Sequence, residues 1–205
     1  MNNDLLTYGN KKMTIPIFSL PATKTCTGST AYCRKYCYAK SAEEMYPSVV
    51  AKRARSLKAS KEKDFVERIV SGLNDVIFIP YVRIHESGDF YSQKYLEKWF
   101  DICGHFPNRK FLAFTKSFNL DFSNKPDNMA LYYSIWCDTD MSTVPEGDNR
   151  AYTVVTYKWF KDQGLVNPDV GNAMKCKGFC DKCLVCFERK SDVYFPIHGR
   201  GVSGH

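Results

Sequence analysis

The chain has 205 residues and a formal charge of +7, with 44% hydrophobic and 25% charged residues. This length suits one domain with a real hydrophobic core, and the composition is ordinary for a soluble globular protein. No apolar run approaches the roughly 20 residues of a membrane span, and the N-terminus lacks the basic-then-apolar character of a signal peptide. We therefore expect a single domain over residues 1–205, located in the cytoplasm and with no membrane partner.

The first half of the chain predicts one strand followed by a loop and several helices. Residues 13–20 read as a buried strand, and a loop rich in Thr, Gly and Ser comes after it. Apolar residues at three- and four-residue steps then indicate helix over 42–57, which Pro47 divides into two. Ser60 is placed to cap a further helix with its apolar stripe over 65–73.

The second half alternates strands with helical patterns. Residues 76–84 predict a strand, and Ser92 is placed to cap a helix that Gly104 ends. Further elements are expected as strands at 110–115, 129–136 and 151–156 and as a short helix at 157–163.

This order of elements is typical of an α/β fold, because the strands are short and apolar throughout, as buried parallel strands are. The chain is short for a full eight-fold barrel of around 250 residues, so we expect a partial (β/α) barrel or an open parallel sheet. In both, function gathers at the carboxyl ends of the strands. The cysteine loop, the His85 turn, Lys116 and Asp138 each follow a predicted strand, so a parallel sheet would place them on one face.

Seven of the nine cysteines fall in two short groups. Cys26, Cys33 and Cys37 form an N-terminal group with the spacing C-x6-C-x3-C, which we call the N-terminal trio. Cys176, Cys180, Cys183 and Cys186 follow C-x3-C-x2-C-x2-C within a Cys-rich segment at 172–190, and we call them the tail cysteines. In a reducing compartment such clusters hold metal more often than they form disulfides.

Thiolates suit iron–sulfur clusters or zinc. Zinc sites usually separate two C-x2-C knuckles by a longer loop, and the tail has no such gap. Its tight run is close to that of bacterial ferredoxins, which favours a [4Fe–4S] cluster with the four tail cysteines as its ligands. The N-terminal trio is a second cofactor-binding candidate, so the chain would hold one cluster or two. Ordinary buried cysteine is the alternative for the trio, as it is for Cys103 on a helix stripe.

A polar turn follows the predicted strand at 76–84. It carries Arg83, His85, Glu86 and Asp89, with Gly88 allowing a tight turn. His85 could transfer protons or ligate metal, and these residues together with Lys116 are the candidate catalytic groups. The alternative is structural: Asp89 caps the next segment, Arg83 pairs with a carboxylate, and His85 is a hydrogen-bonded core residue.

Much of the positive charge lies at 52–63. A solvated helix face is one interpretation, and a contact with nucleic acid is the other.

Three motifs together carry a family resemblance. The stretch T-C-T-G-S-T-A-Y-C-R-K-Y-C-Y-A at 25–39, the stretch R-I-H-E-S-G-D-F-Y at 83–91 and the tail cysteines occur in this order. The chain resembles the phage and prophage family called gene product 88. That resemblance implies a viral or prophage source, and hence the host cytoplasm, rather than a particular reaction.

A more distant resemblance is to radical S-adenosylmethionine enzymes, which are partial or full α/β barrels with three cluster cysteines after the first strand. The N-terminal trio stands in that place, and the resemblance implies a radical-SAM-like fold and a cluster there. The trio departs from the usual C-x3-C-x2-C spacing, and no clear glycine-rich stretch is present for the methionine moiety of S-adenosylmethionine.

We therefore expect a phage-type iron–sulfur protein that transfers electrons to or from an unidentified partner, or an iron–sulfur oxidoreductase acting on a small molecule. A radical S-adenosylmethionine enzyme and a zinc-binding, nucleic-acid-binding module are the alternatives.

Overall fold

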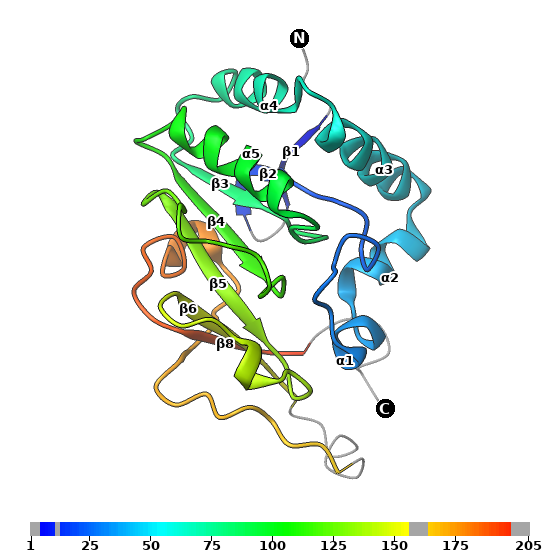
Figure 1. Ribbon diagram of the computed structural model, residues 1–205, viewed down its shortest axis with the longest axis vertical. Helices are drawn as coiled ribbons and strands as arrows, with labels where there is room; N and C mark the ends of the chain where they lie inside the picture. Colours follow the sequence, from blue (N-terminus) through cyan, green and yellow to red (C-terminus); the bar gives the residue numbers. More distant parts are fainter. Residues whose placement is uncertain (1–4, 11–12, 156–163, 198–205) are drawn as a thin grey trace.

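The fold is built on one eight-stranded sheet (Figure 1). The structure, a computed structural model, describes residues 5–10, 13–155 and 164–197. Across the sheet the strands run in the order β1 (Leu6–Asn10), β2 (Met13–Phe18), β3 (Tyr81–Ile84), β4 (Lys110–Thr115), β5 (Met129–Ile135), β6 (Asn149–Val154), β8 (Val193–Pro196) and β7 (Met174–Lys175).

The sheet is parallel except at one edge. β1 pairs antiparallel with β2, and every other neighbouring pair is parallel. The predicted α/β class and parallel sheet are therefore confirmed in this coarse form. The pairing recorded among the described residues is linear, with β1 at one edge and β7 at the other. β1 was not predicted, because five residues give too short a pattern to separate from a loop.

The helices mostly follow the sequence prediction. They are α1 (Ala31–Lys35), α2 (Tyr38–Met45), α3 (Pro47–Lys61), α4 (Phe65–Asn74), α5 (Gln93–Gly104), the 3₁₀ helix η1 (Met141–Thr143) and α7 (Cys180–Cys183). Pro47 does divide two helices, and the Ser92 side chain does cap α5, accepting from Tyr95 N at 3.3 Å. None of the described helices has the length and apolar character needed to cross a membrane.

Two element predictions were wrong. The strand expected at 76–84 begins only at Tyr81, because the backbone N–H groups of Val76 and Ile79 are used in turns rather than in the sheet. Ser60 does not cap a helix but lies inside α3, and α4 begins after Asp64. The helix expected at 157–163 lies outside the described residues.

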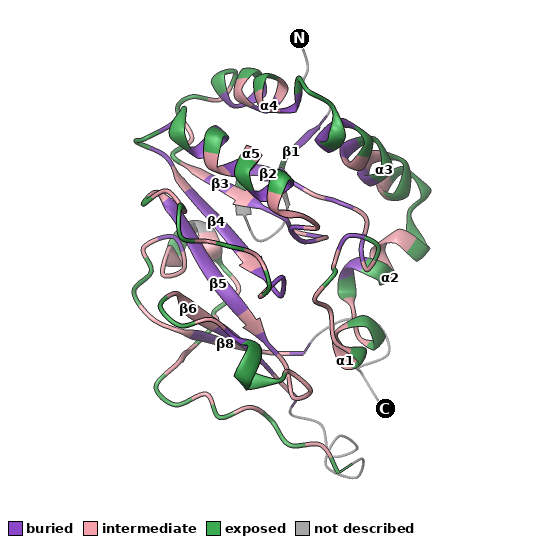
Figure 2. Cartoon of the chain, viewed as in Figure 1, coloured by how far each residue is buried: buried purple, intermediate pink, exposed green. Residues whose placement is uncertain are grey.

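The two faces of the sheet are covered differently. One face packs against α4 and α5, through inward residues such as Val82, Ile84 and Leu131. The other face packs against the segment that carries the tail cysteines, through residues such as Leu112 and Tyr132. In Figure 1 this orange segment lies behind β4 and β5, and Figure 2 shows both strands buried almost along their whole length.

The centre of the helix-covered face is an aromatic cluster. The ring of Trp99 on α5 lies 5.4 Å from that of Phe18 and 5.9 Å from that of Phe65, both edge-on. All three side chains are fully buried. This cluster joins β2, α4 and α5, so it fixes the position of the two helices over the part of the sheet that contains β2.

Replacing Trp99 by alanine should lower the free energy of unfolding by about 3–5 kcal/mol, because it leaves a large cavity in this cluster. Urea denaturation measures the change. Phe78→Ala is the control, since that ring is 79% exposed and its loss should change the free energy by no more than about 0.5 kcal/mol. Equal effects of the two substitutions would contradict the placement of Trp99.

Candidate functional site

The loop after β2 is pressed against the carboxyl edge of the sheet. Leu20 N donates to Ser87 O at 2.8 Å, so this loop lies beside the turn that follows β3. Gly88 in that turn has a φ of +85°, and a Cβ there would lie 2.5 Å from Leu20 Cβ and 2.6 Å from Thr25 Oγ1. A side chain at position 88 is excluded both by backbone strain and by space.

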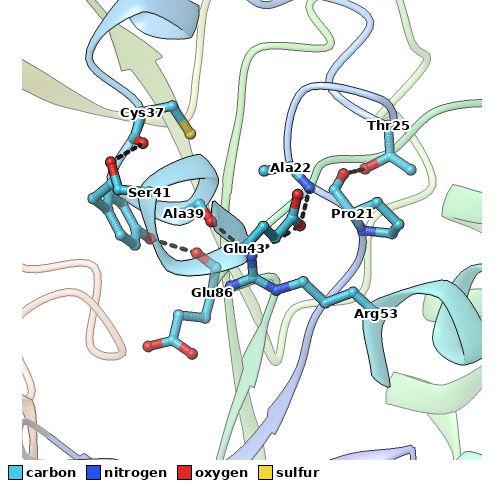
Figure 3. A network of polar contacts seen from close by, with 10 residues as sticks. Pro21, Ala22, Thr25, Cys37, Ala39, Ser41, Glu43, Arg53 and Glu86 are labelled. Carbon is cyan, nitrogen blue, oxygen red and sulfur yellow. Dashed lines mark hydrogen bonds and ion pairs between the residues drawn. The ribbon is translucent and has the colours of Figure 1, made fainter. Parts of the chain in front are cut away.

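A buried ion pair ties the same loop to the helices (Figure 3). Arg53 on α3 donates to Glu43 Oε1 at 3.0 Å and to Ala39 O at 2.9 Å, and Ala22 N donates to the same Glu43 oxygen at 2.8 Å. Arg53 is therefore a buried connection between α2, α3 and the loop. It does not present its charge to solvent.

The N-terminal trio gathers at this edge. Cys26 follows the Thr25 turn, Cys33 lies on α1, and Cys37 directly precedes α2. Each of the three is partly buried, and Cys26 lies within electrostatic reach of both other thiols. Burial raises the pKa of Cys26 to about 12 and that of Cys33 to about 11, with smaller contributions from neighbouring acidic groups. Without a bound metal these thiols stay protonated at neutral pH.

Asp89 joins two loops at the centre of the site. Its Oδ1 accepts from Phe90 N and Thr115 Oγ1, and its Oδ2 accepts from Lys116 N, each at 2.7 Å. The carboxyl is buried, and burial raises its pKa to about 6 despite these hydrogen bonds. It also lies within electrostatic reach of Cys26 and Cys33.

Lys116 places a buried cation beside the trio. Its Nζ donates to Ser134 O at 2.6 Å and lies 5.9 Å from the centre of the Trp136 ring. Burial lowers its pKa to about 8, while nearby Cys33 and Asp138 act in the opposite direction. Asp138 accepts from Tyr32 N at 2.9 Å through Oδ2, whereas its buried Oδ1 has no hydrogen-bond partner among the described residues.

A cavity of about 380 Å³ opens next to Lys116 and Asp138, within the range of small-molecule pockets. Loops after β2, β4 and β5 all contribute to its wall, as expected at the carboxyl edge of a parallel sheet. The lining residues are Gly28, Thr30, Lys116, Phe118, Asn119, Asp138, Thr139, Asp140 and Thr143.

The tail cysteines form a second group, on the face of the sheet opposite α5. Cys186 lies within electrostatic reach of the other three tail thiols, and burial raises its pKa to about 12. All four line one cavity of about 30 Å³ together with apolar side chains such as Leu112 and Phe187. The thiols are thus partly screened from water by the sheet.

Both groups have the chemistry of a metal site, but neither has its geometry. Closely placed thiols are the ligands that zinc and iron–sulfur clusters require, so the donor set fits. Within the described ranges, however, no three His, Cys, Asp or Glu side chains are arranged to hold a metal ion.

Comparisons with known proteins identify the family. A sequence model described as Gene product 88 matches residues 2–193, nearly the whole chain. The chain belongs to the gene product 88 family. Among curated proteins it is similar to the Gene 88 protein of Mycobacterium phage D29, 25% identical over 197 residues, and to that of Mycobacterium phage L5, 26% identical over 202 residues. Each comparison covers 83% of this chain and 81% of the relative. No solved structure matches the chain.

The resemblance to gene product 88 is therefore confirmed, and relatives from two phages support the expected phage type. These comparisons give no support to the more distant relation to radical S-adenosylmethionine enzymes. They also assign no reaction or cofactor to the gene product 88 family.

The five residues predicted to be catalytic do not come together in one place. Asp89 and Lys116 join the N-terminal trio, whereas Arg83 faces the tail cysteines. Glu86 accepts a hydrogen bond from Tyr38 Oη, next to Cys37, through its backbone carbonyl, and it lies within electrostatic reach of Arg83. Their catalytic roles stay predictions.

His85 lies elsewhere, on the helix-covered face of the sheet. Its Nε2 lies 2.8 Å from Tyr95 Oη, and its ring packs 4.7 Å from that of Phe90. Burial lowers its pKa to about 3, so the ring is neutral at physiological pH. These surroundings favour the structural alternative for His85 over proton transfer.

One residue of the site carried no signal in the sequence analysis. Gly28 touches the end of β4 so closely that a Cβ would lie 1.8 Å from Lys116 O. A glycine two residues after Cys26 is common in loops of many kinds, and only the folded chain shows that it faces a backbone carbonyl.

Replacing Gly28 by alanine should displace the cysteine loop from β4 and lower the free energy of unfolding by about 1–3 kcal/mol, the usual range for overpacking. Gly104→Ala is the matched control, because a Cβ there meets nothing within 4 Å, and it should be neutral or slightly stabilising. Urea denaturation of both variants gives the comparison. A neutral Gly28→Ala would show that the loop does not approach β4 this closely.

The raised pKa of Asp89 predicts a pH dependence. The folded carboxyl keeps its proton up to about pH 6, whereas the unfolded chain releases it near pH 4. Its contribution to stability is therefore fully present below about pH 4 and is lost as the pH rises through about 6.

The wild-type chain should lose about 2–3 kcal/mol of unfolding free energy relative to Asp89→Asn between pH 4 and pH 7, because the amide does not titrate. The free energies come from urea denaturation at the two pH values. A constant difference between the two proteins would contradict the raised pKa.

Proposed function

We propose that this protein is an iron–sulfur protein with redox activity, in which Cys176, Cys180, Cys183 and Cys186 hold a [4Fe–4S] cluster. The observation that supports this function is the gathering of all four tail thiols around one small cavity on a face of the sheet. A spacing of two or three residues between thiols allows each short loop to span one edge of a cluster.

The chain's own residues would protect and tune such a centre. Leu112, Val185 and Phe187 surround the tail thiols with apolar atoms, which limit the access of water. Hydrogen bonding, burial and charge around the sulfur atoms are the means by which a protein sets the potential of a bound cluster. When bound, the cluster supplies one-electron transfer, and an electron donor or acceptor is the implied partner.

The N-terminal trio is proposed as the second cofactor site. Three thiolates would leave a fourth position open to a substrate. Lys116 and Asp138 line a cavity, and both lie within electrostatic reach of Cys33. They could therefore orient a polar molecule beside this thiol. This arrangement supports small-molecule redox catalysis as well as simple electron transfer.

The same cavity favours one alternative function, a radical enzyme that uses S-adenosylmethionine at the N-terminal trio. Reductive cleavage of S-adenosylmethionine by the reduced, cluster-loaded chain tests it directly. An intact reduced cluster that leaves S-adenosylmethionine uncleaved would count against this alternative.

The zinc-binding nucleic-acid module has less support. This alternative would use the charge of Arg53, but Arg53 is 7% exposed and bound to Glu43 and Ala39. Lys52 Nζ likewise donates to Leu6 O at 2.9 Å. A contact with nucleic acid would have to rely on the remaining basic residues of α3, such as Arg55 and Lys58, which are exposed.

Protein purified without oxygen should contain about four irons and four sulfides per chain, or about eight of each when both groups are loaded. Iron, sulfide and zinc analysis together with the visible absorption spectrum measures this. Stoichiometric zinc without iron would exclude the redox function and favour the binding module.

Paired substitutions locate the cluster. Cys180→Ala with Cys183→Ala should remove the tail cluster, and Cys26→Ala with Cys33→Ala should remove any cluster at the trio. Cys103→Ala is the matched control, because Cys103 lies on α5, is buried in the core and should leave the iron content unchanged. Retention of all the iron in both paired variants would contradict the assignment.

A further inference from the structure

Arg83 lies on β3, on the face of the sheet that packs against the tail segment, and its position is fixed by the sheet. Alternate residues of β3 face the tail segment: the Tyr81 ring lies 4.9 Å from that of Phe187, and Arg83 Cζ lies 4.2 Å from the centre of the Phe114 ring. The guanidinium also donates through Nε to His85 O at 3.2 Å. It therefore projects from a rigid element rather than from a loop.

The guanidinium is a cation on the same face of the sheet as the tail thiols. Phe114, on which it stacks, packs against the same apolar cluster as Cys180 and Cys186. The guanidinium lies within electrostatic reach of Cys180 and Cys186, and it is only partly exposed. The lysines of the tail segment, Lys175, Lys177 and Lys182, are exposed to water instead. A guanidinium keeps its charge throughout the physiological pH range, so this cation is permanent.

Four thiolates around a metal carry a net negative charge in these apolar surroundings. Such a charge is unfavourable away from water unless an opposite charge stands beside it. We propose that Arg83 is a positioning residue that compensates the charge of the metal-bound tail thiolates and thereby raises the affinity of the tail site for metal. This inference rests on the proposed function, since it requires that the tail cysteines bind metal.

Arg83 differs from Asp89, Lys116 and His85 in that its charge lies beside the tail thiols. Asp89 and Lys116 serve the N-terminal trio and His85 lies in the aromatic core, so neutralising any of them leaves the charge at the tail unchanged. Arg83 also lies within electrostatic reach of Tyr38, the residue after Cys37.

The test is a titration of the full-length, metal-free, reduced chain with Co²⁺ in the absence of oxygen, followed by the thiolate-to-cobalt absorption. The spectrum of a chain with Cys180→Ala and Cys186→Ala is subtracted as the contribution of other thiols. Arg83→Gln should weaken cobalt binding at the tail by about 10–100-fold, the usual effect of losing a group that supports metal ligands. Arg83→Lys, which keeps the charge, should retain most of the affinity.

Arg109→Gln is the matched control. Arg109 is likewise an arginine stacked on a phenylalanine, 4.7 Å from the Phe106 ring, and it donates to Val76 O at 2.8 Å. It directly precedes β4, at the amino ends of the parallel strands, so its loss should leave the affinity for cobalt unchanged. If Arg83→Gln fails to fold, Arg83→Met preserves the apolar contact with Phe114 and removes the charge.

Two outcomes would overturn the inference, and they differ. Equal cobalt affinity in the wild-type chain and the neutral Arg83 variants would exclude charge compensation while leaving the metal site intact. No difference between the wild-type chain and the chain without Cys180 and Cys186 would show that the tail binds no cobalt, which contradicts the proposed function itself.

Discussion

The arrangement of the candidate site depends on one buried carboxylate. Asp89 accepts hydrogen bonds from Phe90 N, Thr115 Oγ1 and Lys116 N, so it ties the turn after β3 to the end of β4. The same contact sets the position of Lys116, whose backbone carbonyl lies against Gly28. Because loops without secondary structure depend on such bonds for their positions, the wall of the cavity is only as well ordered as the surroundings of Asp89.

The sheet keeps two kinds of chemistry apart. Its carboxyl edge gathers the N-terminal trio with a cation, a carboxylate and a cavity, whereas the face opposite α5 buries the tail thiols among apolar side chains. Open and closed metal sites differ in the same way, since catalysis needs an accessible position and electron transfer does not. Arg83 places its charge within reach of the tail thiols Cys180 and Cys186.

The sequence predicted the parallel α/β sheet and the division of the helix at Pro47. It also predicted that Lys116 and Asp138, which follow strands, lie on one side with the N-terminal cysteine loop. It could not predict that Arg83 and His85 face opposite sides. Strand alternation places residues two apart on one face, but His85 has a φ of 60° and turns out of β3 toward the helices. Arg53 likewise belongs to a basic run, and only tertiary contacts show that its charge is buried.

The tail cysteines lie in the loop between β7 and β8, and the pairing of these two strands brings the ends of the loop together. Met174 N donates to Asp192 O at 2.8 Å and Cys176 N donates to Tyr194 O at 2.7 Å, so β7 and β8 meet on either side of the thiols. The entropy of bringing the ends of this loop together is therefore offset by strand pairing before any metal arrives. A metal would meet thiols at a high local concentration, and its removal should loosen the loop without separating the strands that frame it.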